Sequence, residues 1–235
     1  MRQGAEPASA PPVEQWSELA LIPVLATAGY YVLPAELQRA PAVQFLPQIL
    51  AYCSLALWAI KNTAASVRLG LACSQLSQGL QWGLAVGVML GAINVTVIVR
   101  IVPWLGFDIE FLRETPHAHM PVFVMLPWAI LFIAIGVELN FRGFLLGRLV
   151  ALSPPSWLRA YPCLGSGIAV IVSALVFSFD PFMLSTFKHL HWIAVWDGLV
   201  WGMMWVRLRN LYATIIAHAV EVIVMYSALK LLFKV

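Results

Sequence analysis

Seven apolar stretches alternate with short polar segments along the chain. They cover about 17–35, 43–60, 79–103, 121–150, 163–180, 191–208 and 211–233. Each is close to the roughly 20 residues that a helix needs to cross the hydrocarbon core of a bilayer. Backbone polar groups within lipid need partners inside the chain, so stretches of this length predict helices. The pattern therefore predicts an all-α, multi-pass transmembrane helical bundle of about seven spans.

Two features interrupt the pattern. The first 16 residues are polar and rich in proline, and they lack the layout of a cleavable signal. We expect a short disordered tail over 1–16 and a single transmembrane domain over 17–235. Pro127 falls inside the fourth apolar stretch and predicts a kink, because proline removes one hydrogen bond of the helix.

Composition supports a membrane protein and narrows its partners. Hydrophobic residues make up 61% of the chain and charged residues 11%, against roughly 45–50% and about 25% in soluble domains. The net charge of +3 is spread over loops, without a basic block that would bind nucleic acid. Three cysteines, Cys53, Cys73 and Cys163, form no CxxC pair and are expected to be packing residues.

Loop charges predict the orientation of the chain in the membrane. Basic residues near the ends of spans are retained on the cytoplasmic side. The loops after the second, fourth and sixth spans carry these residues in pairs: Lys61 and Arg68, Arg148 and Arg159, and Arg207 and Arg209. The intervening loops are neutral or acidic. We therefore expect a cytoplasmic N-terminus and an external C-terminus.

Charged residues inside spans are costly and usually face the bundle interior, so each is a functional candidate. Glu138 and Arg142 lie four apart in GVELNFRGFLLGRL, the order in which an acid and a base pair on a helix. Such a pair either serves catalysis or neutralises itself in a packed core. Gly143, directly after Arg142, indicates close approach of another segment.

His218 lies on the last span at a matching depth. It stands about two turns below the basic loop, roughly 10 Å into the membrane, and Glu138 stands some 15–18 Å below the loop at residue 150. The two side chains can therefore meet. Glu221, three residues after His218, shares its helix face. A membrane histidine of this kind is either catalytic or an interhelical hydrogen-bond donor.

Further polar groups lie around the sixth span. The connection DPFMLSTFKHLHW supplies Asp180, His189 and His191, which we expect to be solvated by default. Asp197 lies one turn into the span as a candidate buried partner for an arginine or histidine. Gly198 and Gly202 beside it form a face for close helix packing.

Residues 121–233 resemble the CAAX prenyl protease and bacteriocin-processing family of intramembrane endopeptidases. The likeness lies in ELNFRGFLLGRL, in the Gly-xxx-Gly helix and basic hinge that follow, and in LYATIIAHA. The family pattern is EExxxR on one helix, FxxxH on the next and HxxxN on the last. Its first glutamate and two histidines are assigned to water activation, with glutamic-type catalysis the favoured description.

The motifs of this chain depart from the family pattern at three places. The first glutamate of EExxxR is Val137, while Glu138 and Arg142 keep the second glutamate and the arginine. His218 keeps the histidine of HxxxN, and Val222 replaces the asparagine. In FxxxH, Phe177 places Pro181 at the histidine position, whereas Phe187 with His191 matches literally and His189 is a further option.

The resemblance implies an endopeptidase that cleaves a membrane-associated peptide or protein. Its catalytic residues would be Glu138, His218, His191 and Arg142, with His189, Glu221 and Asp180 as further candidates. The alternative is a catalytically silent relative that acts as a membrane binding, immunity or sorting partner. No cofactor is expected, although a divalent metal such as zinc stays open. The expected location is a bilayer, such as the bacterial inner membrane.

Overall fold

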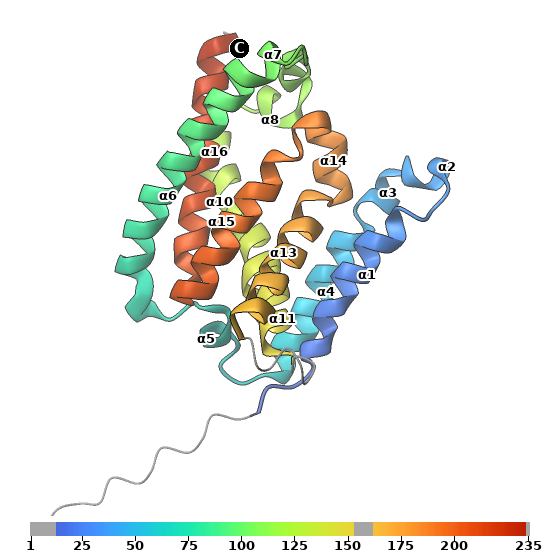
Figure 1. The fold of residues 1–235 in the computed structure, drawn as a ribbon, viewed down its shortest axis with the longest axis vertical. Helices are drawn as coiled ribbons and strands as arrows, with labels where there is room; N and C mark the ends of the chain where they lie inside the picture. Colours follow the sequence, from blue (N-terminus) through green and yellow to red (C-terminus); the bar gives the residue numbers. More distant parts are fainter. Residues whose placement is uncertain (1–12, 153–161, 234–235) are drawn as a thin grey trace, which may run out of the picture.

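The fold of this chain is a helical bundle. A computed structural model describes residues 13–152 and 162–233, and within these ranges every regular element is helical and none is a strand (Figure 1). This confirms the predicted all-α class. Large apolar side chains such as Leu80, Trp82 and Leu84 are exposed on the outer surface. An outer surface of this kind suits lipid and would be unfavourable in water.

The elements follow one another in the order of the apolar stretches. From the N-terminus they are η1 Ser17–Ala20, α1 Leu21–Tyr30, α2 Ala35–Gln38, α3 Pro41–Gln44, α4 Leu46–Lys61, α5 Ala65–Leu69, η2 Cys73–Gln75, α6 Leu76–Thr96, η3 Val97–Ile101, α7 Val102–Trp104, η4 Glu110–Glu114, α8 Pro116–His119, α9 Val122–Val124, η5 Met125–Ala129, α10 Ile130–Glu138, η6 Leu139–Leu146, α11 Gly147–Ala151, α13 Pro162–Ser178, α14 Pro181–Phe187, η7 Lys188–Leu190, α15 Ile193–Leu208 and α16 Leu211–Phe233. The elements η3, η5 and η6 are π-helical, and η1, η2, η4 and η7 are 3₁₀ helices.

Not every predicted span is long enough to cross a membrane unaided. Among the described residues, three helical segments have the length and apolar composition to do so: 65–104, 130–151 and 211–233. A fourth is obtained if α13 and the helix after its 56° bend count as one broken span. The helices of the first two predicted spans are shorter. The apolar helices indicate an integral membrane protein, and the count of seven spans stays a prediction.

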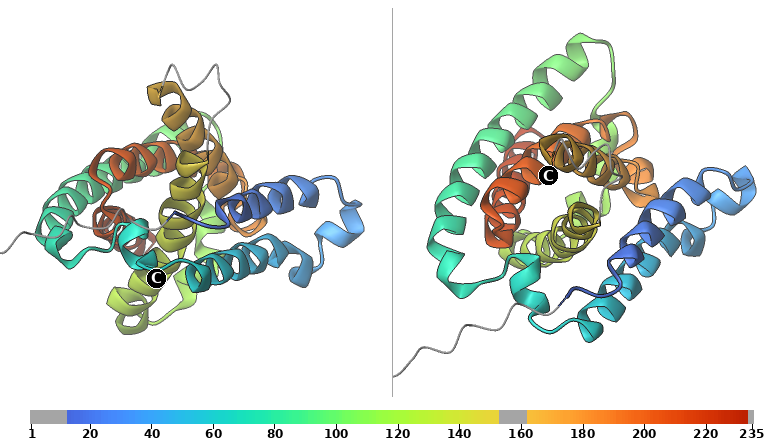
Figure 2. Two further views of the ribbon diagram at one scale, coloured as in Figure 1. Left: turned by 90° about the horizontal axis from the view of Figure 1, so that it is seen from below. Right: turned by 60° about the horizontal axis from the view of Figure 1, so that its bottom comes forward.

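Glycines bring α6 and α16 into close contact. The two helices lie side by side in both views of the ribbon (Figures 1 and 2). Gly79, Gly83, Gly87 and Gly91, spaced by four, all face α16. A Cβ atom on Gly87 would lie 2.6 Å from the carbonyl oxygen of Ala217. On the other side of the bundle, Gly198 and Gly202 of α15 meet α13 in the same way, which confirms the predicted packing face.

We expect Gly87→Ala to destabilise the protein by about 1–3 kcal/mol, because the added methyl group overpacks a contact with backbone atoms. Gly167→Ala is the matched control, since a Cβ atom there meets nothing within 4 Å. Replacing a helical glycine by alanine without a clash stabilises by roughly 0.4–1 kcal/mol. Thermal melts in one detergent measure both, and equal shifts for the two variants would contradict the packing argument.

The three basic loops share one end of the bundle. Glu14 pairs with Arg68 at 3.0 Å and also with Arg148, and Arg148 donates to the carbonyl of Arg68 at 3.5 Å. The N–H of Leu211, beside Arg209, donates to the carbonyl of Gly70 at 2.8 Å. This arrangement agrees with the predicted grouping of the loops. The side of the membrane on which they lie stays a prediction.

Three details differ from or refine the sequence analysis. Leu126 has non-helical angles (φ −105°, ψ 123°), so the kink predicted at Pro127 is confirmed and falls on the residue before proline. Cys53, Cys73 and Cys163 are all exposed, so their expected role as packing residues is wrong. Within the predicted tail, Glu14 is bonded to the bundle, while residues 1–12 and Arg159 lie outside the described residues.

Candidate functional site

Glu138 and Arg142 form a fully buried ion pair where α10 passes into the π-helical η6. Arg142 Nη1 donates to Glu138 Oε1 at 3.1 Å, and both side chains are 0% exposed. This confirms the pairing predicted from their spacing. A buried ion pair is held by the mutual compensation of its charges, so each residue depends on the other.

His218 joins this pair from α16. Its Nδ1 lies 3.0 Å from Glu138 Oε1, so the two residues meet at one depth as predicted. A carboxylate only accepts hydrogen bonds, so the ring proton lies on Nδ1 and points at Glu138. The other ring nitrogen, Nε2, is then an acceptor. An imidazole and a carboxylate arranged in this way correspond to a general base and its orienting group.

Aromatic rings enclose the charged groups. The guanidinium of Arg142 lies 4.5 Å from the ring centre of Phe177 and 4.9 Å from that of Trp201. Trp201 also stacks on His218, with ring centres 4.5 Å apart and planes 20° apart. Such contacts stabilise a desolvated cation through the negative face of the ring. They fix both Arg142 and His218 in place.

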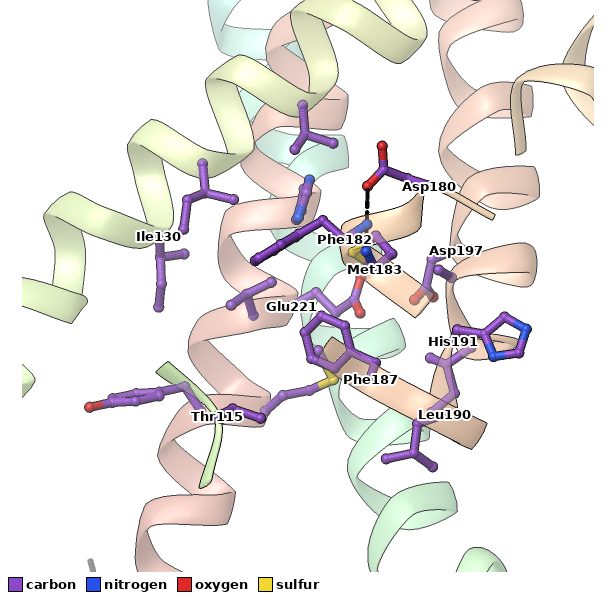
Figure 3. A pocket seen from close by; sticks show the side chains of 18 of the residues that line it. Thr115, Ile130, Asp180, Phe182, Met183, Phe187, Leu190, His191, Asp197 and Glu221 are labelled. Carbon is purple, nitrogen blue, oxygen red and sulfur yellow. Dashed lines mark hydrogen bonds between the residues drawn. The ribbon is translucent and has the colours of Figure 1, made fainter. Parts of the chain in front are cut away.

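A cavity of about 490 Å³ lies beside these groups (Figure 3). Most of its wall is apolar, and its polar residues include His218, Glu221 and Asp197. Glu138 and Arg142 are not on the wall. Within the group formed by Glu138, Arg142 and His218, His218 is therefore the member that borders a space that a ligand can enter.

Several polar atoms on the cavity wall have no partner. Among the described residues, no hydrogen bond reaches Asn140 Oδ1, Trp201 Nε1 or Glu221 Oε2. Buried polar atoms are nearly always hydrogen-bonded to protein or to ordered water. Three residues on the cavity wall thus each carry a buried polar atom whose hydrogen-bonding capacity is unused in an otherwise apolar surrounding.

Asp197 and Glu221 share one amide. Asn94 Nδ2, on α6, donates to Glu221 Oε1 at 2.7 Å and to the two oxygens of Asp197 at 3.1 and 3.2 Å. Trp196 Nε1 donates to Asn94 Oδ1 at 2.9 Å and so fixes which side of the amide faces the acids. The prediction that Asp197 is buried with a polar partner is confirmed. Its hydrogen-bond partner is Asn94, and the expected arginine is Arg142, whose charge interacts with that of Asp197.

Asp180 is buried, which corrects the expectation that it is solvated. It is 3% exposed and caps α14, accepting bonds from the backbone N–H of Phe182 at 3.0 Å and of Met183 at 3.4 Å. Gln48 Nε2 donates to it at 2.8 Å. An aspartate directly before a helix satisfies N–H groups that otherwise lack partners. Asp180 lines the cavity but is committed to this cap.

The two loop histidines lie in different surroundings. His191 lines the cavity and is half-buried, yet its Nδ1 lies 2.7 Å from the carbonyl of Lys188 and its ring points away from Glu221 (Figure 3). His189 packs against the rings of Phe107 and Phe111, with centres 5.3 and 5.2 Å away. Within the part of the chain that the structure describes, neither histidine contacts Glu138 or His218. Both side chains are partly buried, whereas the sequence analysis expected them to be solvated.

Val137 and Val222, the residues at two altered motif positions, both line the cavity. They pack against buried apolar clusters and leave the wall apolar where the family pattern has a carboxylate and an amide. Within the described residues, no group of three or more His, Cys, Asp or Glu side chains is placed to hold a metal ion.

Sequence reasoning missed Asn94, Phe177 and Trp201 as members of the site. Asn94 carried a usable signal, because an asparagine within a long apolar stretch needs a buried partner. The sequence pattern places Phe177 only at a motif position, and it does not single out Trp201. Nothing in a single sequence shows that these aromatic rings meet a buried arginine.

The fold and the site together describe a helical membrane protein with a histidine–glutamate–arginine group beside an internal cavity. Residues 119–224 match the family model described as type II CAAX prenyl endopeptidase Rce1-like. The match spans just under half of the chain, from α8 into α16, and confirms the resemblance seen in the motifs. Searches of curated proteins and of solved structures found no match.

Proposed function

We propose that this chain is an intramembrane endopeptidase that hydrolyses a peptide bond of a membrane-associated peptide or protein. The observation that carries the proposal is the contact between His218 and Glu138, which connects two helices and leaves the imidazole on the cavity wall. The family match supports the same reaction class. An apolar cavity that opens among membrane helices suits a substrate segment that arrives within the bilayer.

In the proposed reaction, His218 Nε2 takes a proton from a water molecule in the cavity. The water oxygen then attacks the carbonyl carbon of the substrate. Glu138 holds the proton on Nδ1 and stabilises the imidazolium that forms, as an orienting carboxylate does for a catalytic histidine. Arg142 keeps Glu138 ionised. The N–H of Trp201, which has no acceptor among the described residues, is available to the substrate carbonyl.

This division of work differs from the one implied by the motifs alone. Glu138 does not reach the cavity wall, so it orients the base and does not itself contact water. His191 and Asp180 are on the wall and remain candidates for contact with the substrate. His189 lies among aromatic rings, and we give it no part in the reaction.

A silent membrane partner is the second candidate function. The observation that favours it is the presence of Val137 and Val222 on the cavity wall, where valine can neither accept a proton nor hold water. Such a protein would bind a peptide in the cavity without cleaving it. It could act in immunity or in sorting.

Cleavage of a fluorogenic peptide library by the purified protein in nanodiscs separates the two functions. We expect the wild type to cleave at least one peptide above the rate of empty nanodiscs. A double variant, Glu138→Gln with Arg142→Met, removes the orienting charge together with its counter-charge and should be inactive. A chelator arm tests whether a metal such as zinc is needed. If the wild type matches empty nanodiscs on every peptide, the protease proposal is wrong and the binding partner remains.

A further inference from the structure

We propose that Glu221 is the general acid of the reaction, donating a proton to the leaving nitrogen, and that Asp197 and Asn94 position it. The inference rests on the proposed function, since it assigns a second residue to the same hydrolysis. After His218 has taken a proton from water, the reaction still requires a proton donor. The amine that departs from a peptide bond needs a proton of its own.

Contacts around Glu221 leave one oxygen for this task. Its Oε1 accepts from Asn94, whereas no donor among the described residues reaches its Oε2. Both oxygens of Asp197 accept from the same amide nitrogen. The two carboxyl groups are therefore neighbours, and like charges so close disfavour double ionisation. The two carboxyl groups are also hydrogen-bonded to each other, so they share a single proton, which we place on Glu221.

The position of Glu221 gives it access to the substrate. Glu221 and His218 lie three residues apart on α16, and both line the cavity. Figure 3 shows Asp197 and Glu221 reaching into the same space from α15 and α16. Glu221 is 1% exposed overall, so this proton is shielded from bulk water.

Other carboxyl groups near the cavity are less suited to the task. Asp180 accepts three hydrogen bonds on Oδ1, from Gln48 and from two N–H groups of α14, and these bonds favour its ionised form, which has no proton to give. Glu138 is paired with Arg142 and is not on the wall. Asp197 has both oxygens engaged. Among the described residues, Glu221 thus combines a second carboxyl group beside it, which favours its protonated form, with a place on the cavity wall.

The complete step conserves atoms and charge. His218 takes a proton from water, and the oxygen of that water forms a bond to the carbonyl carbon. As the tetrahedral intermediate collapses, the carbon–nitrogen bond breaks and the proton of Glu221 passes to the nitrogen. The products are a carboxylic acid and an amine. The proton held by His218 then restores the protonated state of Glu221, directly or through water, and no oxidant or further reactant is required.

A comparison of amide and ester substrates in Glu221→Gln tests the assignment. A departing p-nitrophenolate needs no proton, so removing a general acid should spare a p-nitrophenyl ester of the same peptide. We expect kcat for the amide to fall about 10²–10⁴-fold and kcat for the ester less than tenfold. Glu36→Gln is the control, because it makes the same change at an exposed residue that does not line the cavity. Both of its rates should match the wild type.

Equal losses on the amide and the ester would overturn the assignment, because a purely structural role slows both substrates alike. Unchanged amide turnover in Glu221→Gln, with His218→Ala inactive, would also overturn it while leaving the proposed function in place. A wild type without any cleavage would instead remove the proposed function itself.

A second measurement needs no variant and so does not depend on the folding of Glu221→Gln. The wild type is assayed on a series of peptide anilides whose leaving amines differ in basicity. A general acid protonates the departing nitrogen, so the rate should vary little along the series. A steep rise in rate with more weakly basic leaving amines would contradict a protonated donor at Glu221.

Discussion

His218→Ala is expected to lower turnover by about 10²–10⁴-fold, the usual contribution of a general base. The imidazole is the only part of the histidine–glutamate–arginine group that borders the cavity, so no other member of the group can reach a water molecule there. The fold should persist, because Glu138 keeps its bond to Arg142. Initial rates on a peptide that the wild type cleaves measure the effect.

Two controls separate catalysis from packing at this position. His218→Phe keeps a ring that can stack on Trp201 but has no nitrogen, so it should be as inactive as His218→Ala and more stable. Imidazole added to His218→Ala should restore part of the activity by entering the vacated space. Full activity in His218→Phe would show that His218 serves packing alone.

Arg142→Met is expected to destabilise the protein by about 3–5 kcal/mol, because it leaves Glu138 as a buried charge without its arginine. Both side chains are fully buried, so water cannot take over the role of either partner. Methionine preserves much of the volume between the rings of Phe177 and Trp201, which confines the change mainly to charge. Thermal and denaturant melts in detergent measure the loss.

The double variant Glu138→Gln with Arg142→Met is the control for this pair. Removing both charges should cost less than the sum of the two single changes, since neither is left alone. Additive losses would contradict mutual dependence. Gln in place of Glu138 can still accept a hydrogen bond from His218, so the interhelical contact should survive in the double variant.

Spacing along one helix and depth across two helices were sufficient to predict the central contacts. Glu138 and Arg142 lie four positions apart, and the expected membrane depth brings His218 level with both. In a bilayer, a buried charge has few other places to find a partner, which makes such inferences specific. The kink at Pro127 followed from proline chemistry in the same way.

Residues in the connection between α13 and α15 were harder to interpret. Asp180 was expected in water because it stands in a polar stretch, but the chain bends there and folds α14 back over the cavity. Its carboxylate is buried because it caps that helix. The prediction that the three cysteines are packing residues was wrong for the opposite reason. An apolar stretch in a membrane protein has an outer face, and sequence alone does not distinguish that face from the core.

The acid pair on the cavity wall depended on a contact that no local pattern encodes. Asn94 lies 103 positions before Asp197 and 127 before Glu221, so only the packing of α6, α15 and α16 brings the three residues together. That packing rests on the glycines spaced by four along α6. The glycines were visible in the sequence, although their partner helix was not.

The brevity of α1 and α4 has a consequence for the surrounding lipid. The 16 residues of α4 extend about 24 Å at the rise of an α-helix, less than the roughly 30 Å of an average hydrocarbon core. If α4 crosses the membrane as predicted, a helix this short is accommodated by local thinning of the bilayer, by snorkelling of its flanking residues or by oligomerisation. Gln48 and Tyr52 of α4 border the cavity, so a thinned region would lie at its edge. Thinning on this flank would thus shorten the path by which a polar peptide bond travels from the headgroups to His218.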